Sequence, residues 1–101
     1  MKKVCNDFLM EQFGDQDVVN EIYEEYAKSA KEKIAEADAA LTSENWTELD
    51  RIAHAVKGNA LAVGDNDVAN VAIVLRNAAK LSDKTEAAAL IEKLKELAKE
   101  I

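Results

Sequence analysis

The sequence contains no proline and only three glycines among its 101 residues. A β-sandwich or β-barrel needs many turn residues, so this shortage argues against both folds. Eighteen residues are alanine, which has the highest helix propensity of all residues. The composition therefore predicts an all-α protein, and the length predicts a single domain over residues 1–101.

Long apolar runs and an excess of basic charge are also missing. No stretch approaches the ~20 apolar residues of a membrane span, and the first residues, MKKVCNDF, lack the apolar segment of a signal peptide. The net charge is −7, whereas a protein that binds nucleic acid needs a basic face. We therefore expect a cytoplasmic monomer that binds neither membranes nor nucleic acid.

Cysteine and histidine occur once each, as Cys5 and His54. A single cysteine cannot form an internal disulfide, and this pair offers too few ligands for a zinc site. We interpret Cys5 as an ordinary apolar or surface residue, and we expect no metal site in the chain.

Apolar residues recur at intervals of three and four in five segments, which is the spacing of an amphipathic helix. The pattern predicts a short helix over residues 4–13 and four longer helices that end near residues 41, 63, 81 and 101. Because the connections are short, we predict an antiparallel up-down-up-down four-helix bundle, with the short helix covering one end. The aromatic residues expected in the core are Tyr23, Tyr26 and Trp46, and those expected as core or cap residues are Phe8 and Phe13.

Glycines and small polar residues mark the ends of the predicted helices. Gly14 and Gly64 each follow an apolar segment, where glycine commonly ends a helix. Glu86 lies three residues after Asp83, the spacing of a capping box. The expected N-terminal caps are Asp15, Thr42 or Ser43, Asp65 and Asp83.

The third predicted helix turns His54 away from the core. Each helical residue advances about 100° around the axis, so His54 lies about 160° from Val56, the centre of the apolar stripe. A lone exposed histidine is most often a surface residue without a function. The interpretation of His54 therefore depends on its neighbours.

Two neighbours on the same side of the helix favour a chemical role for His54. Lys57 follows at i+3 and supplies a mobile cation, and Gly58 follows at i+4. Glycine inside a helix costs roughly 1 kcal/mol relative to alanine, so Gly58 indicates cleared space beside the imidazole. A neutral imidazole is a nucleophile at pH 7, because its ordinary pKa is about 6.5. This arrangement suits a phosphoryl acceptor.

The run His54-Ala55-Val56-Lys57-Gly58, followed by Gly64 ten residues after the histidine, resembles the histidine-containing phosphotransfer (HPt) domain. The resemblance covers nearly the whole chain. It implies a phosphocarrier rather than an enzyme, with His54 accepting a phosphoryl group on Nε2 from an aspartate of a receiver domain. It also implies that Lys57 neutralises phosphate charge and that Gly58 keeps the approach open.

The same resemblance implies that this chain holds no cofactor, since Mg²⁺ is expected on the receiver domain. The partners it implies are receiver domains of response regulators, a hybrid histidine kinase, or both.

HPt domains of chemotaxis kinases carry an acidic residue after the leucine that Leu75 matches, where this chain has Arg76. Arg76 is either solvated or in contact with phosphate. A relay between receiver aspartates is thus favoured. The alternatives are a phosphoacceptor domain of a chemotaxis-type or hybrid kinase and a non-catalytic helical adaptor with the same fold.

Residues around His54 supply candidates for partner binding. Leu61, two turns after His54, is expected to form an apolar floor for a receiver helix together with Ala55 and Ala62. Asp50 and Arg51 lie one turn before the histidine. Each either touches the ring or the phosphate, or forms a surface salt bridge, and Arg51 is included among the predicted partner-binding residues.

Overall fold

The computed structural model describes all residues from Met1 to Ile101 and is entirely α-helical, without strands. The prediction of an all-α protein is therefore confirmed. The five helices are α1 (Lys3–Phe13), α2 (Gln16–Thr42), α3 (Trp46–Ala62), α4 (Asn66–Lys80) and α5 (Lys84–Ala98). None of them combines the length and the apolar character that crossing a membrane requires.

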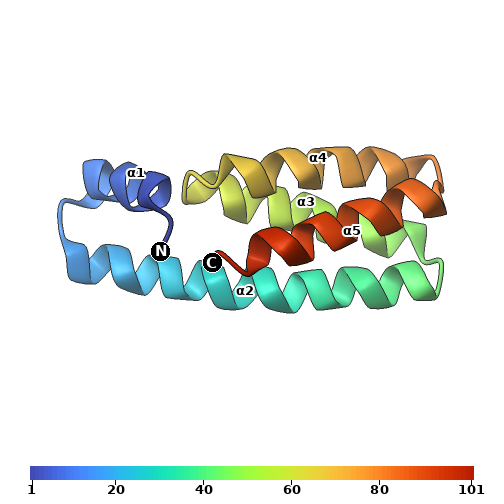
Figure 1. The fold of residues 1–101 in the computed structure, drawn as a ribbon, viewed down its shortest axis with the longest axis horizontal. Coiled ribbons are helices and arrows are strands. Elements are labelled where there is room, and N and C mark those ends of the chain that lie inside the picture. Colours follow the sequence, from blue (N-terminus) through green and yellow to red (C-terminus); the bar gives the residue numbers. More distant parts are fainter.

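The four longer helices lie side by side along the long axis of a molecule measuring 42 × 20 × 18 Å (Figure 1). α2 packs against α3 and α5, and α4 packs against the same two helices, so the four surround a common core. α1 lies at one end of the molecule and packs against α2 (Figure 1). The helix that carries His54 thus has neighbours on two sides and leaves its remaining side to solvent.

The core is a single cluster of 26 buried apolar residues, ten of which are alanines. Small side chains let helix axes approach closely, and the most extensive helix pair, α3 with α4, illustrates this. Ala53 and Ala60 of α3, and Ala69 and Ala72 of α4, are completely buried. α3 is therefore held firmly beside α4 along the segment that carries His54.

Aspartate caps begin three of the helices, as predicted. Asp15 accepts hydrogen bonds from the first turn of α2, Asp65 from the backbone N–H of Val68, and Asp83 from that of Glu86. The predicted capping box between Asp83 and Glu86 forms only in part. The Asp83 side chain accepts from the backbone of Glu86, but the backbone N–H of Asp83 donates to the carbonyl of Ala78 and not to the Glu86 side chain.

The cap of α3 differs from the prediction of Thr42 or Ser43. Asn45 caps this helix, and its side-chain oxygen accepts from the backbone N–H of Glu48 at 3.2 Å. The hydroxyls of Thr42 and Ser43 instead donate to carbonyl oxygens in the last turn of α2. These hydroxyls therefore complete the end of one helix rather than begin the next.

The aromatic residues divide between the core and the surface. Tyr23 and Tyr26 are buried in an edge-to-face pair with ring centroids 5.7 Å apart, and Trp46 is half-buried against the core. Of the two expectations for Phe8 and Phe13, a place in the core was wrong, since they are 36% and 50% exposed. The side chain of Phe8 lies beside Gly64 in the connection between α3 and α4. α1 is short and packs on a single helix, so it buries only Cys5 and Leu9.

A buried carboxylate connects α1 to the rest of the fold. Asp65, which is 1% exposed, accepts hydrogen bonds from Lys2 Nζ at 2.8 Å and from the Tyr26 hydroxyl at 2.7 Å. Burial and the hydrogen bond to Asp65 both raise the pKa of Tyr26. A residue expected only to cap α4 therefore also ties the N-terminal segment and α2 to the connection between α3 and α4.

Candidate functional site

His54 lies in the middle of α3, and its side chain is exposed. The buried residues of the same helix, such as Leu49, Ile52 and Val56, occupy the opposite face, as the helical wheel predicts. No other side chain forms a hydrogen bond with the ring, in contrast to several of its neighbours on α3. Both ring nitrogens are therefore free to react or to bind a partner.

The surface beside the imidazole is open at Gly58. A Cβ atom at this position would meet nothing within 4 Å apart from its own helix. The backbone of Gly58 does not require glycine either, because its φ lies outside the left-handed region. Packing within this chain thus does not account for glycine here, and the open surface adjoins His54 one turn away.

Lys57 is the free cation of the site. Its side chain is half-buried on α3, and its ammonium group pairs with no carboxylate, whereas both neighbouring arginines are paired. Three N–H donors therefore remain for an anion bound at His54.

Arg51 forms an ion pair with Glu48 on the same helix. Its Nε and Nη2 donate to the two carboxylate oxygens of Glu48, the first at 3.0 Å. This hydrogen bonding raises the pKa of Arg51 and lowers the pKa of Glu48. Because the pair is exposed, it contributes little to stability, and a partner can exchange its contacts at small cost.

Asp50 and Arg76 form an ion pair between helices α3 and α4. Arg76 Nε donates to Asp50 Oδ1 at 2.8 Å, and the two side chains are 33% and 29% exposed, respectively. For Asp50 and Arg51, the unligated protein therefore has the salt bridges that the sequence left open. Arg76, expected to be either solvated or in contact with phosphate, is bound to Asp50 in the unligated protein. No feature of the sequence predicts the Asp50–Arg76 pair, because its members lie 26 positions apart on different helices.

The predicted docking residues lie on two sides of the histidine. Leu61 is 46% exposed and follows His54 by two turns on nearly the same line of the helix. Ala62 lines a groove of about 280 Å³ between α2 and α3, and half-buried Ala55 lies two turns earlier on the same side. Ala55 and Ala62 therefore face toward α2, and Leu61 faces outward.

Two exposed apolar residues of α4 could not be predicted from the sequence. Ile73 is 42% exposed and Val74 is 44% exposed, although the other apolar residues of α4 are buried. They belong to no motif, so the sequence alone does not single them out. Nowhere in the chain do three or more histidine, cysteine, aspartate or glutamate side chains form a group that could hold a metal ion.

The fold and the site define an all-helical protein that presents one unpaired histidine on an open helix face, with a free lysine beside it. Residues 21–101 match the family model of the Hpt domain, and the chain belongs to this family. The resemblance seen in the sequence is therefore confirmed. No curated protein and no solved structure matches the chain.

Membership of the family sets the general function. Hpt domains take part in histidine phosphotransfer in two-component signalling, where they carry phosphoryl groups and interact with receiver domains. The match begins within α2, so α1 lies outside the matched region.

Proposed function

We propose that this protein carries a phosphoryl group on His54 between aspartates of receiver domains in a phosphorelay. The observation that carries the proposal is the combination of an exposed, unbonded His54 with the free cation of Lys57 and the open surface at Gly58. The Hpt family match over residues 21–101 supports the same chemistry.

The transfer step uses the lone pair of His54 Nε2. This lone pair forms the N–P bond as the P–O bond to the receiver aspartate breaks, and the aspartate leaves as a carboxylate. The proton on Nδ1 stays on the ring, which becomes a phosphorylated imidazolium and can then lose that proton to water. The reverse reaction passes the phosphoryl group to the next receiver.

Lys57 and Gly58 have different roles in this step. The ammonium group of Lys57 neutralises part of the charge on the phosphoryl oxygens, for which its lack of an ion pair is an advantage. Gly58 leaves room for the phosphoryl group and for the surface of the receiver. We propose that this chain binds no cofactor and that the receiver binds the Mg²⁺.

The receiver docks over the exposed face of α3. Leu61 provides an exposed apolar contact, Ala55 and Ala62 flank it on the side of α2, and Arg51 offers a charged contact at the edge. Exposed leucine beside small residues suits a close helix–helix contact. The protein is proposed to act as a monomer in the cytoplasm.

We also infer that residues 1–101 form a single domain whose long helices make an antiparallel up-down-up-down bundle. Each of the three connections between long helices has only three residues, which suits a reversal of direction. The course of the chain in Figure 1 and the packing of α5 against α2 agree with this arrangement.

A phosphoacceptor domain of a chemotaxis-type or hybrid kinase is the second candidate. In chemotaxis kinases an acidic residue occupies the position of Arg76, and Arg76 here is already bound to Asp50. An arginine has no acceptor atom with which to orient the imidazole, so the relay between receivers is favoured. A non-catalytic adaptor would have no need of an unpaired histidine and lysine one turn apart.

Phosphotransfer from receivers tests the proposal directly. The protein is incubated with a panel of receiver domains labelled with ³²P on aspartate, alongside the variant His54→Gln. We expect acid-labile, base-stable label on the wild-type protein and none on the variant. Label that persists on His54→Gln, or a wild-type protein that accepts none from any receiver, would contradict the proposal.

A further inference from the structure

We propose that Arg76 is a second phosphoryl-binding residue, held ready by Asp50, which stabilises the phosphorylated state of His54 together with Lys57. The inference rests on the proposed function of His54 and assigns a role to the ion pair between α3 and α4. It identifies Arg76 as a ligand of the phosphoryl oxygens, rather than as a residue that activates the imidazole for attack.

The ion pair shows which levels of the two helices lie side by side. Arg76 Nε is bonded to Asp50 Oδ1, and α3 and α4 run in opposite directions in Figure 1. Moving four residues forward from Asp50 on α3 therefore corresponds to moving four residues back from Arg76 on α4. His54 is thus one helical turn, about 6 Å along the axis, from the level of the pair.

The directions of the side chains reduce this separation. Helical side chains lean toward the N-terminus of their own helix. His54 therefore leans toward the level of Asp50, while Arg76, on the antiparallel helix, leans toward the level of His54. Asp50 and His54 also lie within about 40° of each other around α3, so the pair and the imidazole share one side of the helix.

Lys57 completes the arrangement from the opposite direction. It follows His54 by three residues and lies on the side of α3 that faces α4, as Asp50 does. A phosphoryl group on His54 therefore has the guanidinium of Arg76 on one side and the ammonium group of Lys57 on the other.

The guanidinium of Arg76 has donors to spare. Only Nε–H is used within the protein, so both terminal nitrogens lack a protein acceptor. Arg51 differs, because its Nε and Nη2 are both taken by the Glu48 carboxylate. Asp50 thus bonds only Nε of Arg76. The two terminal nitrogens stay free, and such a pair of donors can bind two phosphate oxygens at once.

The chemistry of arginine decides between the two possible roles. A carboxylate at this position could accept the Nδ1 proton and orient the ring, whereas arginine can only donate. The phosphoryl group brings negative oxygens, which are the acceptors that arginine binds best. Arg76 therefore acts on the phosphorylated product.

Phosphorylation by potassium phosphoramidate tests the inference without any receiver. The phosphoryl group passes from the nitrogen of the reagent to His54, and ammonia leaves. ³¹P NMR then gives the pKa of the phosphoryl group, and the decay of its signal gives the half-life of phosphohistidine. Other charged groups around the site are Glu48, Asp50, Arg51 and Lys57 on α3, Lys80 on α4 and Glu36 of α2.

The variants Arg76→Ala and Arg76→Lys separate charge from geometry. A cation favours the dianionic phosphoryl group, so Arg76→Ala should raise its pKa and shorten the half-life about three- to tenfold. Arg76→Lys should recover part of the loss, because it keeps the charge without the fork. Asp50→Asn should shift the phosphoryl pKa in the opposite direction, since it removes a negative charge and keeps an oxygen acceptor for Nε.

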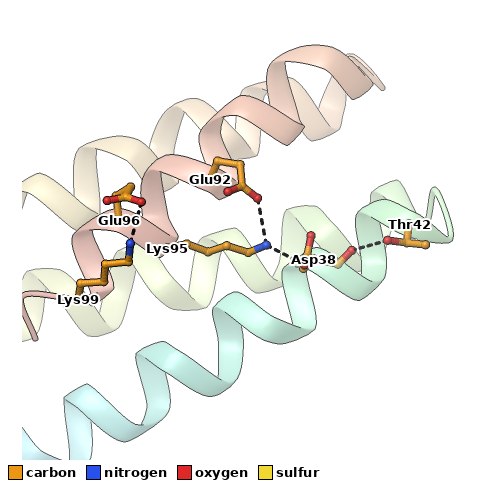
Figure 2. Close-up of polar contacts among 6 residues, drawn as sticks. All are labelled: Asp38, Thr42, Glu92, Lys95, Glu96 and Lys99. Atoms are coloured by element: carbon orange, nitrogen blue, oxygen red, sulfur yellow. Dashed lines mark hydrogen bonds and ion pairs between the residues drawn. The ribbon is translucent and has the colours of Figure 1, made fainter.

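Lys95→Ala is the matched control. Lys95 donates to Asp38 of α2 at 2.9 Å and to Glu92 of α5 at 3.0 Å, so its loss also removes one positive charge and an interhelical ion pair (Figure 2). It lies between α2 and α5, on helices that carry neither His54 nor Arg76, and its removal should leave both measurements unchanged.

The outcomes distinguish this inference from the proposed function. No ³¹P signal from phosphohistidine in the wild-type protein would overturn the proposed function, and the inference with it. A normal signal with identical values for wild type, Arg76→Ala and Lys95→Ala would overturn the role of Arg76 alone. Equal effects of Asp50→Asn and Arg76→Ala would show that the ion pair acts only through the structure, and would also overturn that role.

Discussion

At the scale of single residues, Lys57 differs from the arginines near it because no carboxylate neutralises its charge. Lys57→Ala should slow phosphotransfer to His54 or shorten the lifetime of phosphohistidine. The free energy of unfolding should change by less than about 0.5 kcal/mol, because no ion pair is lost. Transfer rates and urea unfolding of the variant test both parts. Unchanged transfer and lifetime would reduce Lys57 to a solubilising residue.

Gly58 separates function from folding stability at one position. Alanine is favoured over glycine inside a helix by roughly 1 kcal/mol, and a Cβ at Gly58 meets nothing within 4 Å. Gly58→Ala and Gly58→Leu should therefore leave thermal unfolding unchanged or shift it upward. Phosphotransfer should fall in a graded manner from Gly to Ala to Leu, because larger side chains crowd the phosphoryl group and the receiver.

Two results would contradict this expectation in different ways. Unfolding of Gly58→Leu would mean that glycine is needed for packing and that this face of α3 is not open. Normal folding together with normal transfer would mean that the cleared space has no function.

The orientation of His54, Lys57 and Gly58 could be predicted from the sequence, because all three lie on one helix whose geometry is fixed by 3.6 residues per turn. The pairing of Arg76 with Asp50 could not. It depends on the register of two helices, which is set by the packing of side chains such as Ala53 and Ala72.

At the scale of secondary-structure elements, Gly64 is required for two reasons where α3 meets α4. Its φ is +73°, in the left-handed region, and a Cβ there would lie 2.7 Å from Cγ of Phe8. Gly64→Ala should therefore destabilise the protein by more than the about 1 kcal/mol that a left-handed alanine costs. Chemical denaturation measures this free energy.

Gly14 provides the matched control for this prediction. Its φ is +65°, but a Cβ there would meet nothing within 4 Å. Gly14→Ala should therefore cost less than Gly64→Ala. The difference should shrink in a Phe8→Ala background, which removes Cγ and Cδ1 of Phe8 but keeps its Cβ, 2.9 Å from a Cβ at position 64. An undiminished difference without the Phe8 ring would show that contact with the ring is not its cause.

The ends of the helices show where local sequence suffices. Asp15, Asp65 and Asp83 could be predicted as caps because each precedes an apolar helical pattern and bonds within three residues of itself. The start of α3 could not, since Ser43 and Asn45 are both competent caps. The choice depends on where α2 ends, and the hydroxyl of Ser43 is taken by carbonyls of that helix.

At the scale of the whole molecule, Asp65 joins parts of the chain that are far apart in sequence. Its carboxylate receives Lys2 from the N-terminal segment and Tyr26 from α2, and also caps α4. Burial and the Asp65 charge raise the pKa of Cys5 to about 11, and burial raises the pKa of Tyr23. For Lys2, burial lowers the pKa, but the hydrogen bond and charge of Asp65 outweigh it.

These groups make the stability of the whole molecule sensitive to alkaline pH. Cys5, Tyr23, Tyr26 and Lys2 all hold their protons more tightly in the folded protein than in the unfolded chain. The unfolded chain therefore binds fewer protons once the pH exceeds the ordinary thiol pKa of 9.0, and the free energy of unfolding falls as the pH rises. Urea unfolding from pH 7 to 11 measures this slope.

The double variant Cys5→Ala, Tyr26→Phe should be less stable at pH 7 but should show a flatter slope above pH 9, because it lacks two of the titrating groups. An equally steep slope in the variant would show that the cluster around Asp65 does not cause the alkaline loss of stability.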